Sequence, residues 1–197
     1  MSILNRIDDR YAVEHSIDRQ LIPRFEPKNG NECARLLLLL ERPGPGSVGT
    51  PQTGGSGVIS QFNEDVTARM LRAQLELADI APADLCITNI VPHVRSARAR
   101  VSDEQVNQAE IEMGFTRLLE VVDAIAPLQN IVLFGNKAKL VKNRLRDARP
   151  WIELHDAFHT SAQASGGGRN PESSKNSMWE HNVHLMKTIR PKHWGQI

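Results

Sequence analysis

The sequence predicts an α/β protein, a three-layer α/β/α sandwich with a central four-stranded parallel sheet. Four short apolar runs alternate along the chain with longer segments in which apolar residues recur at helical spacing. Alternation of this kind implies parallel strands joined by right-handed crossovers, with helices on both faces of the sheet. The first run, 36–40, consists only of leucine, as expected for a strand that is buried on both faces.

The chain opens with a polar segment that contains scattered apolar positions. Within 1–33 these positions indicate an amphipathic helix that ends before Pro23 and is followed by a linker through Gly30. We therefore divide the chain into an N-terminal helical extension with its linker, 1–30, and an α/β domain, 31–197.

A strand over 34–40 comes next. Leucine is also a good helix former, but the Pro-Gly-Pro-Gly segment that follows, 43–46, favours a short strand. Residues 43–57 are rich in Gly, Pro, Ser and Thr and predict a long loop, which in a compact domain is usually functional or disordered. A helix is expected over 64–78, because Leu71 and Leu75 recur on one face.

The rest of the chain continues the alternation of strand and helix. Strands are predicted over 85–91, 130–135 and 151–158. The segment 102–105 has the sequence of a capping box, and the helix that it opens carries an apolar face from Ile111 to Ile125. A basic helix over 137–146, a glycine-rich loop over 159–175 and a last helix over 178–189 complete the sandwich.

Composition narrows the class of protein. The 197 residues are 40% apolar and carry a formal net charge of +1, which fits one folded domain without an overall attraction to nucleic acid. We expect no signal peptide and no membrane contact, since no apolar run approaches the roughly 20 residues of a membrane-spanning helix. With only two cysteines, Cys33 and Cys86, we expect a cytoplasmic protein without a disulfide framework.

The loops after the strands hold most of the unusual residues. Parallel sheets bind ligands at the carboxyl ends of their strands, where these loops gather. The loops in question are 41–63, 89–102, 135–136 and 159–175. Their candidate functional residues are Glu41, Arg42, Asn89, His93 and His159.

Three stretches, in this order, resemble motifs of the uracil-DNA glycosylase superfamily. The first, 40–44 (Leu-Glu-Arg-Pro-Gly), is similar to the motif that holds the water-activating residues. The second, 87–92 (Ile-Thr-Asn-Ile-Val-Pro), is similar to the strand whose asparagine reads the flipped base. The third, 158–161 (Phe-His-Thr-Ser), is similar to the His-Pro-Ser motif of the DNA-intercalating loop. The resemblance covers about residues 33–190 and points to an uncharacterised bacterial branch without an iron–sulfur cluster.

The resemblance implies a role for each matched residue. Glu41 would orient the attacking water or stabilise the sugar cation, Asn89 would read the base, and His159 would support the departing base. The remaining base-binding residues would be Phe62, which would stack on the base, and Arg42, Pro43 and Gly44.

The chemistry of N-glycosidic cleavage suits these residue types. Cleavage develops positive charge on the sugar and negative charge on the base, so a carboxylate and a hydrogen-bond donor are needed. An asparagine offers a donor and an acceptor together, which matches the edge of uracil. Each residue also has a purely structural alternative: Glu41 as a turn cap, Asn89 bonded to backbone, His159 as a satisfied loop histidine, and Phe62 as a hydrophobic staple.

Contacts to DNA are expected from polar and basic residues of the same loops, namely Arg95, Arg98, Arg100, Ser161 and Arg169. A second basic cluster, over 137–149, is interpreted as a solvated helix face. The loop 161–174 lacks the apolar wedge of intercalating proteins, which favours single-stranded or lesion-containing DNA as the partner.

Three departures from the superfamily motifs define the functional alternatives. Leu40 stands in place of a glycine, Arg42 in place of Asp, Asn or Ala, and Thr160 in place of a proline. The first hypothesis is a monomeric, monofunctional DNA glycosylase that removes uracil or another deaminated base and uses neither metal nor cofactor. The alternative is a non-catalytic nucleic-acid or nucleobase-binding protein with the same fold. A third option is a hydrolase of nucleosides or other small ligands.

Overall fold

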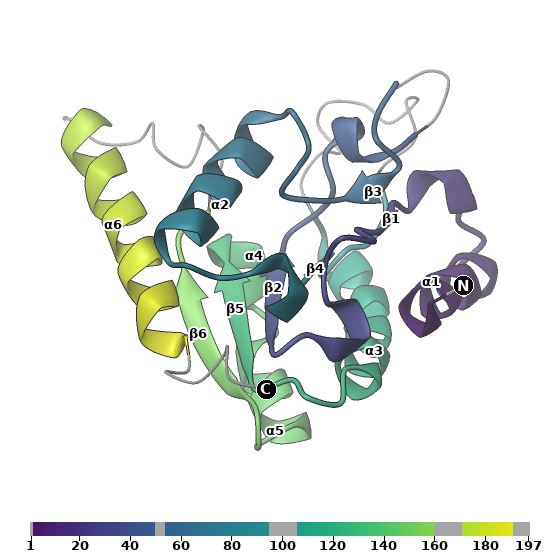
Figure 1. Ribbon diagram of the computed structural model, residues 1–197. Helices are drawn as coiled ribbons and strands as arrows, with labels where there is room; N and C mark the ends of the chain where they lie inside the picture. The colour runs from purple at the N-terminus through teal and green to yellow at the C-terminus, as the bar shows by residue number, and fades with distance from the viewer. Residues whose placement is uncertain (1, 50–53, 95–105, 160–170, 191–197) are drawn as a thin grey trace.

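A four-stranded parallel sheet forms the centre of the molecule (Figure 1). The computed structural model describes residues 2–49, 54–94, 106–159 and 171–190. The strand order is β4-β2-β5-β6, and the strands are β2 (Leu36–Leu40), β4 (Leu85–Asn89), β5 (Asn130–Phe134) and β6 (Glu153–Ala157). The predicted α/β class and the four parallel strands are thus confirmed.

Helices cover both faces of this sheet, as Figure 1 shows. The helices of the described chain are α1 (Ile3–Glu14), α2 (Val66–Leu77), α3 (Gln108–Ala124), α4 (Gly135–Lys139), α5 (Lys142–Ala148) and α6 (Pro171–Ile189), of which α1 packs on α3. Two further strands, β1 (Arg24–Phe25) and β3 (Val58–Ile59), pair in a small parallel sheet that the sequence pattern did not predict. Short 3₁₀ turns lie at η1 (Arg19–Leu21), η2 (Asn31–Cys33), η3 (Pro45–Ser47) and η4 (Pro82–Asp84).

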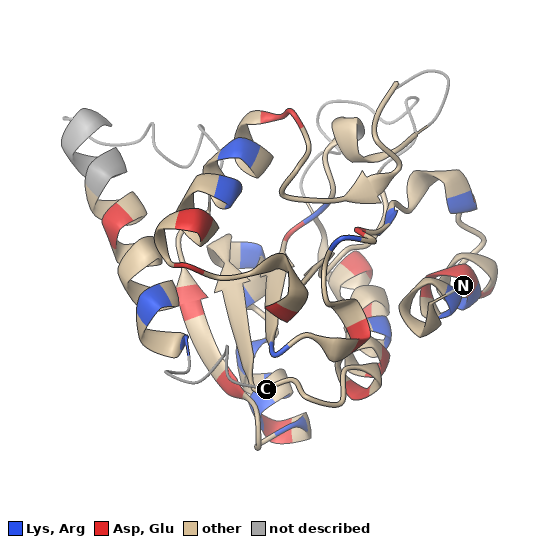
Figure 2. Cartoon of the chain, viewed as in Figure 1, with Lys and Arg blue, Asp and Glu red and all other residues tan. Residues whose placement is uncertain are grey.

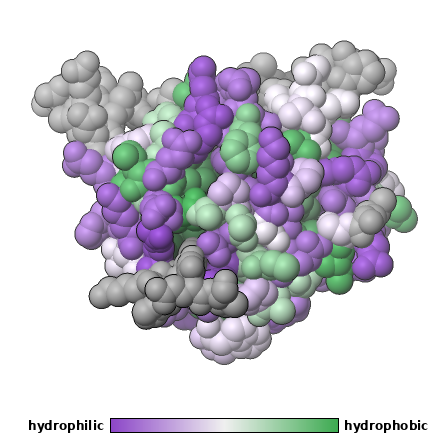
Figure 3. Space-filling view, viewed as in Figure 1, coloured by the Kyte–Doolittle hydropathy of each residue, from purple (hydrophilic) through white to green (hydrophobic). Residues whose placement is uncertain are grey.

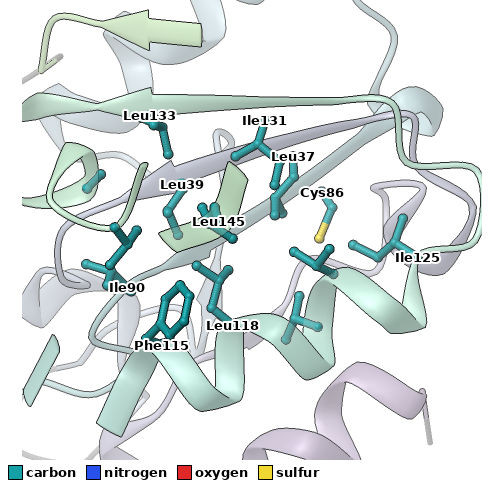
Figure 4. Close-up of a cluster of buried hydrophobic side chains, with 14 of the residues drawn as sticks. Leu37, Leu39, Cys86, Ile90, Phe115, Leu118, Ile125, Ile131, Leu133 and Leu145 are labelled. Atoms are coloured by element: carbon teal, nitrogen blue, oxygen red, sulfur yellow. The ribbon is translucent and has the colours of Figure 1, made fainter. Parts of the chain in front are cut away.

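The leucine strand β2 fills the core on both sides of the sheet, because successive side chains of a strand point to opposite faces. Leu37 and Leu39 belong to one buried cluster, which α3 covers (Figure 4). Leu36 and Leu38 belong to the other cluster, which α2 and α6 cover. Burial on both faces explains why the run is apolar without interruption.

Several boundaries differ from those predicted. The helix expected to open at 102–105 begins at Gln108, where Asn107 and Glu110 form the capping box. Both segments have the local sequence of a cap, and only Asn107 directly precedes the packed helix. The basic helix over 137–146 is divided into α4 and α5. The last helix begins at Pro171, inside the predicted loop 159–175; proline is favoured in the first turn of a helix.

The N-terminal segment packs against the rest of the chain. The helix α1 ends at Glu14, earlier than the predicted end before Pro23, and the turn η1 follows it. Leu4 and Ile7 of α1 lie in the same buried cluster as the apolar face of α3. Residues 1–30 therefore contribute to the core as well as extending the chain.

The surface is polar and mixed in charge. Lys and Arg lie among Asp and Glu on most elements (Figure 2), and hydrophilic side chains predominate on the face drawn in Figure 3, with hydrophobic ones in separate patches. Within the described ranges, no helix has the length and apolarity to cross a membrane.

Candidate functional site

A cavity of about 300 Å³ opens at the carboxyl ends of β2 and β4. Its walls come from the end of β2 and the loop after it, the start of α2, the end of β4 and the segment after β6. Five residues named from the sequence line it: Arg42, Pro43, Gly44, Asn89 and His159. The parallel sheet therefore brings the three sequence motifs to one place, as the rule for the carboxyl ends of strands predicts.

Most of the cavity wall is apolar. Leu40, Ile59, Leu71 and Ile87 line it. Leu40, which stands where the resembled motif has a glycine, is 6% exposed; it forms part of the wall and leaves the cavity open. An apolar cavity with a few convergent polar groups is the usual form of a small-molecule site, although about 300 Å³ is at the lower end of the common range.

Asn89 is the most informative polar group of the wall. It is the last residue of β4 and is 3% exposed. Its Nδ2 amide is buried and has no hydrogen-bond partner among the described residues. An unpaired buried donor costs about 1–3 kcal/mol, and in the wall of a cavity a bound ligand or water can supply the missing acceptor.

His159 is held in the wall by its neighbours. Gly135, the first residue of α4, has a φ of +80°, and a Cβ atom added to it would lie 3.0 Å from Cδ2 of the imidazole. Glycine tolerates this positive φ and leaves room for the ring. Burial lowers the pKa of His159, while the negative charge of Glu41 acts in the opposite direction. Burial thus favours the neutral imidazole, which carries one N–H donor and one acceptor nitrogen.

Asn182 of α6 fixes the backbone beside His159. The side chain of Asn182 is 2% exposed; it accepts a hydrogen bond from the N–H of Phe158 at 2.9 Å and donates one to the carbonyl of Phe158 at 2.9 Å. These two hydrogen bonds attach Phe158, the residue after β6, to the last helix, α6. Asn182 was not among the residues predicted from the sequence; the signal for it was an asparagine next to the apolar Val183 in the predicted last helix.

Glu41 and Arg42 follow β2 and are both partly buried. The backbone carbonyl of Glu41 accepts a hydrogen bond from Val91 at 3.0 Å, but Glu41 is not among the residues that line the cavity. Arg42 does line it, and its guanidinium donates to Oε1 of Glu110 at 2.6 Å and to the carbonyl of His93 at 3.3 Å. Arg42 therefore ties the loop after β2 to α3.

The structure does not bring Phe62 to the cavity. The ring lies 5.2 Å from the ammonium of Lys28 and borders a separate depression, next to Leu75 and Ile80. Phe62 is therefore not placed to stack on a base in this cavity. His93 is buried, with its ring centroid 6.2 Å from that of Tyr11, and does not line the cavity.

The predicted DNA-binding residues, Arg95, Arg98, Arg100, Ser161 and Arg169, lie outside the residues that the structure describes. In the second basic cluster, Lys142 pairs with Asp156 at 2.9 Å. Arg144 pairs with Glu112 at 2.8 Å, and Arg149 pairs with Asp123. These ion pairs fit the interpretation of that cluster as a helix surface.

Other polar residues of the cavity were not foreseen: Ser47, Ser60, Asp65 and Thr67. Asp65 caps α2, since its Oδ1 accepts a hydrogen bond from the N–H of Ala68 at 3.0 Å. An aspartate just before an amphipathic helix was the available signal.

A buried ion pair lies behind Asn89. Arg117 of α3 and Asp8 of α1 are 3% and 1% exposed, and Nε of the arginine donates to Oδ1 of the aspartate at 2.7 Å. The same guanidinium donates to the hydroxyl of Thr88 at 2.6 Å and to the carbonyl of Asn89 at 3.4 Å. Burial raises the pKa of Asp8, against the attraction of Arg117. The pair links α1 and α3 to the end of β4.

Acidic pH is expected to weaken the fold through His159. Its pKa is lower in the folded protein than the 6.5 of an unperturbed histidine, so the unfolded state binds more protons as the pH falls. The stabilising contribution is complete above the unfolded pKa and is lost as pH falls through the window below it. We expect wild type to lose stability relative to His159→Gln as the pH falls from neutral to below 6.5, as measured by urea unfolding. If the difference in stability between the two proteins does not change with pH, the lowered pKa of His159 is contradicted. Burial also lowers the pKa of His155, but this residue is present in both proteins and its effect cancels.

Comparison with known proteins adds no relative. No protein-family model matches the chain, and a search of curated proteins found no match. Among the described residues, no group of three or more potential metal ligands occurs. The functional argument therefore depends on the geometry of the cavity.

Proposed function

We propose that the chain is a DNA glycosylase with a uracil-DNA glycosylase-like three-layer fold, which hydrolyses the N-glycosidic bond of uracil or another deaminated base. The observation that carries this proposal is the buried, unpaired amide of Asn89 in the wall of the cavity. A carboxamide presents a donor and an acceptor, which complement the carbonyl and N–H groups of a uracil-like edge.

The other residues would act on the two ends of the breaking bond. Water adds to C1′ of the sugar as the bond to the base breaks, and the electron pair leaves with the base. The neutral imidazole of His159 donates a hydrogen bond to the base oxygen on which charge develops. The carboxylate of Glu41, whose charge acts on His159, takes the proton of the water and faces the sugar cation.

The proposed partner is DNA whose base has left the stack. A cavity bounded by Leu40, Ile87 and Leu71 receives a base only when that base is turned out of the strand. Single strands and mismatched sites present such bases at the lowest energetic cost, which agrees with the absence of an apolar wedge in 161–174.

One observation favours a second candidate, a non-catalytic binder of nucleobases or nucleic acid. Glu41, the residue assigned to water, is not among those that line the cavity. A binder would use Asn89 and the apolar walls in the same way and would bind without turnover.

A lesion panel separates the two candidates. Oligonucleotides with uracil, hypoxanthine, xanthine or a G·T mismatch are incubated with the protein, and alkali reveals abasic sites. We expect cleavage of at least one of them, with turnover reduced by about 10²–10⁴-fold in Glu41→Gln and binding retained. Binding without cleavage by the folded wild type would favour the binder, and neither binding nor cleavage would reject both.

A further inference from the structure

A partly exposed aromatic residue immediately precedes His159 in the chain. This residue is Phe158, which is 38% exposed. The two hydrogen bonds between the side chain of Asn182 and the backbone N–H and carbonyl of Phe158 fix the backbone of Phe158. Phe158 and His159 are consecutive in the chain, so their Cα atoms are about 3.8 Å apart; one side chain is partly open to solvent and the other lines the cavity.

Two nitrogen-containing side chains, from α4 and α6, lie next to the ring of Phe158. The ammonium of Lys139, from α4, lies 5.6 Å from the ring centroid. The imidazole of His181, from α6, meets the ring edge-on with centroids 5.1 Å apart. Unlike Lys142 and Arg144, Lys139 forms no ion pair with a carboxylate within the described part of the chain. Its charge is therefore available to an anionic partner.

We infer that Phe158, Lys139 and His181 form a stacking platform for a nucleotide next to the one whose base occupies the cavity. An aromatic ring stacks on any base, and a nearby ammonium attracts the phosphate that joins the two nucleotides. The inference rests on the proposed function and sharpens it: the preferred ligand is an oligonucleotide strand, bound more tightly than a free base or nucleoside.

The other end of β6 supplies a matched control. Trp151 is 68% exposed, and the guanidinium of Arg149 lies 5.7 Å from its ring. Trp151 precedes β6, at the amino end of the sheet, whereas Phe158 follows the strand at the end where the cavity lies. Trp151→Ala therefore removes an exposed aromatic with a neighbouring cation and leaves the cavity untouched.

The test compares two probes in a Glu41→Gln background, in which turnover is suppressed. One probe is a labelled single-stranded oligonucleotide with a central uracil, measured by fluorescence anisotropy; the other is free uracil, measured by calorimetry. We expect Phe158→Ala to weaken oligonucleotide binding by about 5- to 150-fold and to leave uracil binding unchanged. Lys139→Gln should lower the salt dependence of oligonucleotide binding by about one phosphate contact. Trp151→Ala should change neither affinity.

The outcomes distinguish this inference from the proposed function. The platform would be overturned if Phe158→Ala kept the oligonucleotide affinity of the parent protein, or if Trp151→Ala lost as much oligonucleotide affinity as Phe158→Ala. In either case the cavity could still bind uracil. Equal losses for both probes in Phe158→Ala would show that the ring supports the cavity and binds no second nucleotide. A parent protein that binds neither probe would reject the proposed function and the platform together.

Discussion

Replacement of Arg117 with methionine is expected to lower the free energy of unfolding by about 3–5 kcal/mol, a large part of the roughly 5–15 kcal/mol that holds a typical domain together. The substitution leaves the carboxylate of Asp8 buried, with its main partner removed. It also removes the donor to Thr88 at the end of β4. Urea unfolding near neutral pH measures the loss.

Two further variants isolate the cause of this loss. Combining Arg117→Met with Asp8→Leu removes both charges, and we expect it to recover most of the stability, because the isolated buried charge is then absent. Arg144→Met breaks a pair whose side chains are 42% and 48% exposed, and we expect a change below about 1 kcal/mol. If Arg117→Met is as mild as Arg144→Met, the buried pair does not hold α1 and α3 to the sheet.

Replacement of Asn89 with leucine is expected to change stability and activity in opposite directions. Leucine of similar size removes the unpaired buried amide, so we expect the free energy of unfolding to rise by about 1 kcal/mol. The same change removes the polar group proposed to read the base, so kcat/KM on a cleaved oligonucleotide should fall by about 10²–10³-fold. Such a trade between stability and activity is characteristic of residues kept for binding.

Asn130 supplies the comparison for this variant. It is also a buried asparagine of the main sheet, in β5, and is 6% exposed, but its Oδ1 lies 2.9 Å from Nε2 of His155 at the other end of the sheet. We expect Asn130→Leu to lose about 1 kcal/mol and to keep full activity, because it breaks an existing hydrogen bond away from the cavity. A loss of stability in Asn89→Leu would instead assign Asn89 a structural role.

Local patterns in the sequence were sufficient for the sheet and for part of the cavity. A run of five leucines between turn residues can be buried only where both faces are covered, which is how β2 lies. Parallel strands place their carboxyl ends at one edge, and this rule alone brought Asn89, His159 and the residues after β2 together. These features follow from the geometry of strands and crossovers, which a single chain already encodes.

Contacts between distant side chains required the tertiary structure. The segments 102–105 (Ser-Asp-Glu-Gln) and 107–110 (Asn-Gln-Ala-Glu) both have the residue pattern of a cap, and α3 begins after Asn107 of the second. Phe62 precedes the expected helix at a plausible spacing, yet it borders a separate depression next to Leu75 and Ile80 and does not line the cavity. The pairing of Asp8 with Arg117 and the contact of Asn182 with Phe158 join residues far apart in the chain. No local pattern encodes such contacts, because which polar groups meet depends on how helices orient against the sheet after the chain has folded.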